Sequence, residues 1–105
     1  MNKQEFSEII GRGREQPGVE FKGGGSRKDK RLLAKVVRAV IGMANRRDGG
    51  RVIIGVQENE GGALTPNGVS SKDLATWNYD DLADSLAQYV DPSVNFDLET
   101  IEQGR

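Results

Sequence analysis

The chain has 105 residues, of which 35% are hydrophobic and 14 are glycines, with a formal net charge of −1; these values fit one small globular domain. It contains no cysteine and no histidine, which excludes disulfides, Cys- or His-based zinc sites, cysteine nucleophiles and histidine bases within this chain. Any metal would need oxygen ligands, which favours Mg or Mn. No apolar run approaches the roughly 20 residues of a membrane span, and residues 1–5 contain no apolar signal-peptide core. We therefore expect a cytoplasmic protein without a membrane partner.

The charge is distributed unevenly along the chain. Residues 1–51 contain 13 Lys and Arg against 6 Asp and Glu, a balance of +7, whereas residues 52–105 contain 2 against 10, a balance of −8. This asymmetry favours a basic face that binds a polyanion. The alternative is that the two halves pair with each other or with a second copy, which leaves a homodimer open.

The first half of the chain predicts a helix, a strand and a second helix. Residues 4–10 place their apolar side chains on one helical face. Residues 19–22 alternate apolar and polar side chains, so they predict a strand on which Glu20 and Lys22 share the face opposite the core. After three glycines, residues 26–44 show the clearest apolar stripe of the chain and predict a long helix that starts at a serine cap.

The second half predicts shorter elements and completes the fold class. The predicted elements are a buried strand at 51–56, a loop at 57–62, a short strand at 63–69, helices at 70–77 and 78–90, and a final strand at 94–99. The long helix allows the strands on either side of it to pair in parallel. We expect an α/β (α+β) fold: a single compact domain over residues 1–105, with one mixed sheet packed by two to three helices. Because the chain stops directly after a predicted strand, we also expect a fragment of a longer protein.

Basic residues gather on and around the long predicted helix. Four of them recur at steps of 3, 4 and 3, which places them opposite the apolar stripe. Such a row can bind backbone phosphates by charge; the alternative is a solvated helix face that keeps the domain soluble. The candidate nucleic-acid contacts are Lys22, Arg27, Lys28, Arg31, Lys35 and Arg38, with Arg46, Arg47 and Arg51 beyond them.

Three carboxylates form a second candidate site. Glu15 and Glu20 are five residues apart, the second on a predicted strand, and Glu58 follows the next predicted strand. If these strands are adjacent and parallel, Glu58 lies within reach of Glu20. Three carboxylates suit a hard divalent cation that activates water or stabilises charge on a phosphodiester. The structural alternative is that Glu15 caps a turn, Glu20 pairs with Lys22 or Arg51, and Glu58 is solvated.

Other signals carry less weight. No Gly-Lys-Ser/Thr follows the glycines at 23–25, which excludes a P-loop for nucleotide hydrolysis. Trp77 and Tyr79 are the aromatic residues placed where exposure would let them stack on bases, although core or edge packing is the favoured interpretation for both.

Several of these residues together resemble a known family. The motifs are E-x4-E-F-K at 15–22, A-N followed by G-G at 44–50, and I-G-V at 54–56. In this order they resemble the Schlafen AlbA-like family of DNA-binding AlbA domains, which implies the family's α/β fold and a nucleic-acid partner. Some Schlafen-type members are endoribonucleases with two glutamates and one aspartate in the active site. By this resemblance Glu15 and Glu20 match the two glutamates, and Glu58 stands where the family has Asp. One extra residue before Gly49-Gly50 is a further departure from the pattern.

Three functional hypotheses follow. The first is a nucleic-acid-binding module, the N-terminal domain of a larger protein resembling a transcriptional regulator, that contacts phosphates of DNA or RNA through the basic helix and needs no cofactor. The second is a Mg- or Mn-dependent endoribonuclease in which Glu15, Glu20 and Glu58 are the catalytic residues and metal ligands. The third is a protein-interaction or dimerisation module in which basic and acidic halves meet between subunits.

Overall fold

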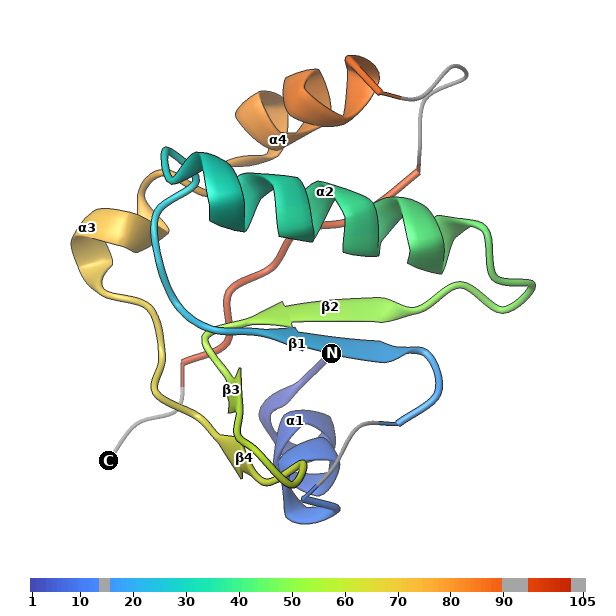
Figure 1. Cartoon of the computed structure of the whole chain (residues 1–105), viewed down its shortest axis with the longest axis vertical. Helices are drawn as coiled ribbons and strands as arrows, with labels where there is room; N and C mark the ends of the chain where they lie inside the picture. Colours follow the sequence, from blue (N-terminus) through green and yellow to red (C-terminus); the bar gives the residue numbers. More distant parts are fainter. Residues whose placement is uncertain (14–15, 90–94, 103–105) are drawn as a thin grey trace.

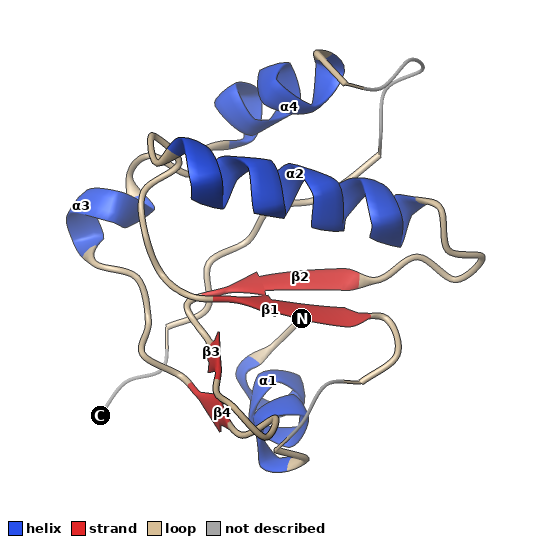
Figure 2. Cartoon of the chain, viewed as in Figure 1, coloured by secondary structure: helices blue, strands red, loops and turns tan. Residues whose placement is uncertain are grey.

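The computed structural model describes residues 1–13, 16–89 and 95–102. Its elements in chain order are α1 (Lys3–Gly11), β1 (Val19–Lys22), α2 (Lys30–Ala44), β2 (Arg51–Ile54), β3 (Gln57–Glu58), β4 (Leu64–Thr65), α3 (Ser71–Leu74) and α4 (Tyr79–Ala87). Strands β1 and β2 lie between α1 on one side and α2 on the other, and α4 lies on the outer side of α2 (Figure 1). Helices and strands thus share one small domain, which confirms the α/β class (Figure 2).

Strands β1 and β2 pair in parallel, as the sequence predicts. Val19 lies opposite Arg51, and Lys22 lies opposite Ile54. Helix α2 makes the crossover between them and runs in the opposite direction to both strands (Figure 1). The C-terminal end of α2 therefore lies beside the start of β1.

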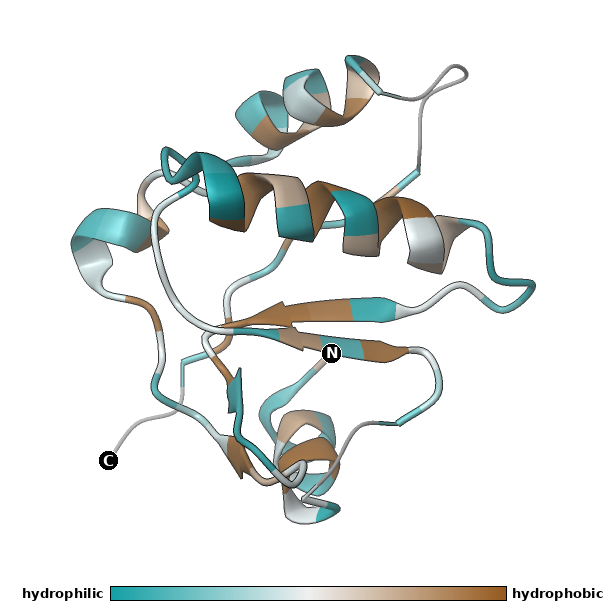
Figure 3. Ribbon diagram, viewed as in Figure 1, coloured by the Kyte–Doolittle hydropathy of each residue, from teal (hydrophilic) through white to brown (hydrophobic). Residues whose placement is uncertain are grey.

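Hydrophobic clusters cover both faces of this parallel pair. On the α1 side, Phe21 and Ile53 pack with Phe6 and Ile9. On the α2 side, Ile54 packs against the second cluster, and Figure 3 shows hydrophobic residues on both strands and polar residues alternating with hydrophobic ones along α2. Because successive side chains of a strand point to opposite faces, the polar residues of β1 lie on the α2 side. The second cluster comprises Val36, Val37, Trp77, Leu82 and Leu86.

Helix α2 begins later than predicted. Its N-cap is Asp29, whose carboxylate accepts hydrogen bonds from the backbone N–H groups of Arg31 and Leu32. The residues before it form a turn, in which Lys28 N donates to Ser26 Oγ at 3.0 Å. A carboxylate that satisfies two of the unpaired N–H groups of the first turn is a strong cap. Asp29, expected to support a cap at Ser26, is therefore the cap itself.

The strands of the described residues form two separate two-stranded sheets, where one mixed sheet was predicted. Strand β2 ends at Ile54 because Gly55 has a φ of +107°, a conformation that turns the chain away from the sheet. Strands β3 and β4 then pair antiparallel, so residues 57–58, predicted as loop, are strand.

The predicted final strand is also wrong where the structure describes it. Residues 95–99 form no strand, and Val94 lies outside the described residues. Phe96 packs with the cluster on the α2 side of the sheet, whereas Ile101 packs with the cluster on the α1 side. The segment therefore crosses from one layer to the other instead of running along the sheet, and Leu98 between these two residues is exposed.

Helix α4 begins where the sequence predicts. Asn78 is its N-cap, and Asn78 Oδ1 accepts a hydrogen bond from Asp81 N at 2.9 Å. The helix ends at Ala87, before the predicted end at residue 90, which lies outside the described residues. The Asn78 side chain, which caps the first turn, therefore determines where this helix begins.

The aromatic residues around α4 divide between core and surface. Trp77 is buried and donates its indole N–H to Gly25 O at 2.9 Å. Tyr79 stacks on Phe96 with ring centroids 4.6 Å apart, and half of Tyr79 stays exposed. The packing interpretation is therefore confirmed for Trp77, which joins α4 to the turn before α2.

Candidate nucleic-acid interface

An open groove of about 470 Å³ runs between β1 and α2. Its volume falls in the range of small-ligand pockets, which is about 300–1,000 Å³. The lining residues are Glu20, Lys22, Lys35, Arg38, Ala39, Gly42, Met43 and Arg46. Four of these side chains are cationic and one is anionic, which gives the groove a formal charge of +3. The groove therefore combines residues predicted for two different sites.

Strand β1 supplies the side of the groove opposite α2. Glu20 and Lys22 alternate with the buried Val19 and Phe21, so both polar side chains point toward α2. Lys22 Nζ lies 3.4 Å from Glu20 Oε2, and these two side chains are 24% and 35% exposed. Glu20 thus pairs with Lys22, one of the two partners expected from the sequence. This partly solvated pair adds little to stability, and the Glu20 side chain makes no other hydrogen bond or ion pair with the described residues.

Helix α2 supplies the opposite side and the base of the groove. Lys35 and Arg38 are exposed, whereas Val36 and Val37 of the same turn are buried, so the helix presents its polar face here. Gly42 lies one turn beyond Arg38, and the space at its Cβ position is open, with no atom within 4 Å. A residue without a side chain keeps the groove hollow at this point.

Arg46 lines the groove, although the sequence places it beyond the six main candidate contacts. It follows the C-terminal end of α2, and its Nε donates to Gly49 O at 3.2 Å. Its guanidinium also lies over Gly18, with Nη2 3.7 Å from the position that a Cβ there would take. Gly18 directly precedes β1, so Arg46 lies at the end of the groove where β1 begins.

The other predicted basic residues lie outside the groove lining. Lys28 precedes α2 and Arg31 lies in its first turn, and both are exposed. Arg51 Nη2 pairs with Glu5 Oε2 at 2.9 Å, so it ties β2 to α1. Arg31 therefore extends the basic row of α2, Lys28 lies in the turn before the helix on the side of α3, and Arg51 is paired on the other side of the sheet.

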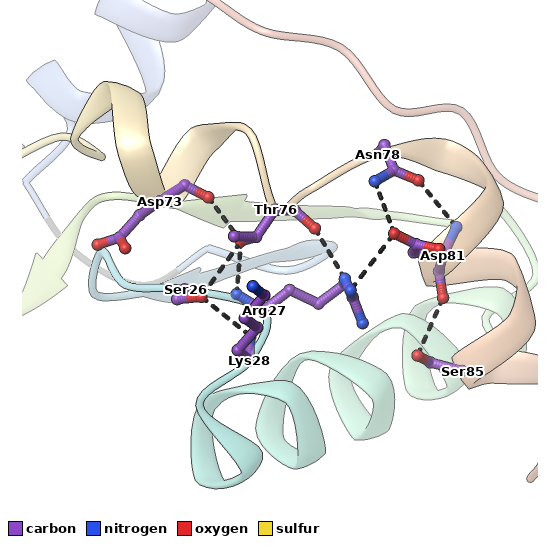
Figure 4. A network of polar contacts seen from close by, with 8 residues as sticks. All are labelled: Ser26, Arg27, Lys28, Asp73, Thr76, Asn78, Asp81 and Ser85. Atoms are coloured by element: carbon purple, nitrogen blue, oxygen red, sulfur yellow. Dashed lines mark hydrogen bonds and ion pairs between the residues drawn. The ribbon is translucent and has the colours of Figure 1, made fainter.

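Arg27 belongs to a polar network that joins the turn before α2 to α3 and α4 (Figure 4). Its Nε donates to Thr76 O at 2.7 Å, its backbone N donates to Thr76 Oγ1 at 2.8 Å, and its Nη2 lies 3.3 Å from Asp81 Oδ2. Only 21% of its side chain is exposed. With its donors used in this way, Arg27 holds the fold together, and we leave it out of the proposed contacts.

The three predicted acidic residues are only partly placed. Glu20 lies in the groove, and Glu58 is exposed on β3. Glu15 lies outside the described residues. Within the ranges that the structure describes, no three Asp or Glu side chains come together in a way that could hold a metal ion. The three-carboxylate site, with its Mg or Mn, therefore stays a prediction.

Comparison with known proteins gives one match. The family model described as "Schlafen, AlbA_2" matches residues 15–105, most of the chain, which agrees with the resemblance carried by the motifs at 15–22, 44–50 and 54–56. Searches of curated proteins and of solved structures return no match. None of the helices in the described part of the chain is long and apolar enough to cross a membrane.

Proposed function

The chain belongs to the Schlafen, AlbA_2 family, and from that premise we propose that it binds nucleic acids by their phosphates through the groove between β1 and α2. The family is associated with nucleic-acid binding in general. The finer proposal concerns which residues make the contacts and what they recognise. These residues are Lys22, Lys35, Arg38 and Arg46 in the groove, with Arg31 one turn before Lys35 on α2 and Lys28 just before the helix.

The observation that supports this proposal is the concentration of positive charge in a chain whose net charge is −1. Four cations line one groove with a single carboxylate between them. A patch of this kind attracts a polyanion even when the whole protein is acidic, because the potential near a surface is set by the local charges within about 10 Å at ordinary salt. Contacts to phosphates carry no base sequence information, so we expect weak sequence preference.

The salt dependence of binding tests the phosphate contacts. If about four phosphates are neutralised, log K for duplex DNA should fall with log salt with a slope near −3.6. Lys35→Gln should reduce this slope by about 1, whereas Lys3→Gln, an exposed cation on α1 beyond the other face of the sheet, should leave it unchanged. Fluorescence anisotropy over a salt series measures both slopes. Binding that ignores salt, or equal slopes for the two variants, would contradict the proposal.

The hypothesis of a metal-dependent endoribonuclease shares this groove, because Glu20 lies in it. Glu20→Gln separates the two functions. If the groove only binds phosphates, removal of its one negative charge should tighten binding by about 2–5-fold, and Glu8→Gln on α1 should not. If Glu20 is a metal ligand, the same variant should abolish Mn-dependent RNA cleavage while it still binds RNA.

This second outcome needs a cleavage assay beside the binding assay. Cleavage by wild type that is lost in Glu20→Gln would support the nuclease with Glu15, Glu20 and Glu58. Equal cleavage by both proteins would indicate a contaminating enzyme, and no cleavage by either with tighter binding of the variant would favour binding alone.

A further inference from the structure

The groove between β1 and α2 is short and has an arginine at one end. Arg46 is held there by its hydrogen bond to Gly49 O at 3.2 Å and by its packing over Gly18. The opposite end lies at Lys22, the last residue of β1.

The size of the groove agrees with a single nucleotide. Its volume of about 470 Å³ lies within the range of small-ligand pockets, so the end of one strand fits into it. The open position beside Gly42, where no atom lies within 4 Å of a Cβ, gives room for a group that enters between α2 and β1. The exposed cations outside the groove, Lys28 and Arg31, remain available for the rest of the strand.

The charge of the groove favours a terminal phosphate over an internal one. A phosphomonoester carries about −1.5 to −2 at pH 7, whereas an internal phosphodiester carries one negative charge. With four cations around one carboxylate, the additional charge of the monoester is attracted by every cation of the lining. Arg46 is also suited to an end group, because a guanidinium can bind two phosphate oxygens at once.

We propose that the groove binds the end of a nucleic-acid strand that carries a phosphomonoester, with Arg46 and the α2 cations around the terminal phosphate and the following nucleotides along the exposed face of α2. This inference rests on the proposed phosphate-binding function and narrows it to strand ends. The remaining step is a measurement that separates preference for an end from binding to phosphates in general.

The test compares single-stranded oligonucleotides of one sequence that differ only at the unlabelled end. Oligonucleotides with a 5′-phosphate, a 5′-hydroxyl, a 3′-phosphate or a 3′-hydroxyl are titrated with the full chain by fluorescence anisotropy. At least one phosphorylated end should bind about tenfold tighter than its hydroxyl counterpart at low salt, because the terminal phosphate adds a charge of about −1.5 to −2 near several solvated cations. Equal affinities for all four would overturn the proposal and leave the salt-dependent binding intact. Absence of binding to all four would instead overturn the proposed function itself.

Two variants locate the preference in the groove. Gly42→Leu should fill the groove without any change in charge, so the preference for phosphorylated ends should fall to about 1, and every strand should bind more weakly because all of them use this groove. Arg46→Gln should reduce the preference, whereas Arg47→Gln, which removes the same charge one residue outside the lining, should retain it. Unchanged preference in both Gly42→Leu and Arg46→Gln would overturn the assignment to this groove.

Competition distinguishes a strand end from free phosphate. Inorganic phosphate lacks the chain that contacts the face of α2, so it should displace the phosphorylated oligonucleotide only at concentrations far above those at which an unlabelled phosphorylated oligonucleotide does. Equal potency of the two competitors would overturn the strand-end proposal in favour of a simple phosphate site.

Discussion

Reversal of two charges in the groove should reduce nucleic-acid binding by about 100-fold. The double variant Lys35→Glu/Arg38→Glu changes the charge on α2 by four units, from two cations to two anions on the side that faces Glu20 and Lys22. At roughly 0.7 kcal/mol for each unit near a solvated phosphate, the total is about 2.8 kcal/mol, which corresponds to two decades in Kd. Anisotropy titrations at a fixed low salt concentration measure this loss directly.

The matched control carries the same change of charge on the other side of the sheet. Lys3→Glu/Arg12→Glu alters two exposed cations on and beside α1, so it lowers the net charge of the protein equally. All four positions are exposed and away from the two cores, so neither variant should unfold the protein. Thermal melts of both variants check this. If the control weakens binding as much as the groove variant does, net charge rather than the groove governs binding.

The sequence predicts those parts of this site that depend only on the side-chain periodicity within one strand or one helix. Alternation along β1 predicts that Glu20 and Lys22 share a face, and the structure places both toward α2. Helical spacing likewise predicts that Lys35 and Arg38 lie opposite the apolar stripe, and both are exposed beside the buried Val36. These predictions hold because the side-chain direction within a strand or helix follows from the backbone alone.

The residues whose roles the sequence cannot tell apart depend on contacts between elements. Arg46 follows α2 in a turn, and its place over Gly18 depends on how that turn meets the start of β1. Arg27 has the same charge and a similar position near α2, yet it binds Thr76 and Asp81 from the second half of the chain. No periodicity separates these two arginines, because the distinction is made by residues that are distant in sequence.

The split of the sheet has the same kind of origin. The apolar run from 52 to 56 predicts a single strand over residues 51–56, but Gly55 adopts a positive φ and donates its backbone N–H to Lys22 O at 2.8 Å. The chain can turn at this point because glycine has no Cβ that opposes such a conformation. A glycine inside a strand pattern signals a bend of this sort, although only the fold shows that β3 then pairs with β4.

Two glycines should respond in opposite directions to the same substitution, and the larger effect is expected at Gly24. A Cβ at Gly24 would lie 2.2 Å from the backbone oxygen of Gly68, which cannot move as a flexible side chain would. Gly68 in turn donates its N–H to Gly55 O at 2.8 Å, so displacement of this segment also endangers that hydrogen bond. Overpacking at about 1–3 kcal/mol and a lost hydrogen bond at about 1 kcal/mol predict that Gly24→Ala lowers the free energy of unfolding by roughly 2–4 kcal/mol.

Gly42→Ala is the control because it makes the same chemical change in open space. Gly42 lies inside α2 with no atom within 4 Å of its Cβ position, so alanine should raise the free energy of unfolding by about 0.5–1 kcal/mol through its helix propensity. Differential scanning calorimetry should then show a Tm lower than wild type by about 10 °C or more for Gly24→Ala and higher by a few degrees for Gly42→Ala.

Gly24 is solvent-exposed, and exposure alone predicts that both positions tolerate alanine. Similar Tm values for the two variants would therefore mean that the approach of residue 68 to residue 24 is not a constraint on the fold. Opposite shifts would show that close backbone packing requires glycine in the run before α2. They would also show that the stability of the fold does not require glycine at position 42, where its absence of a side chain shapes the groove.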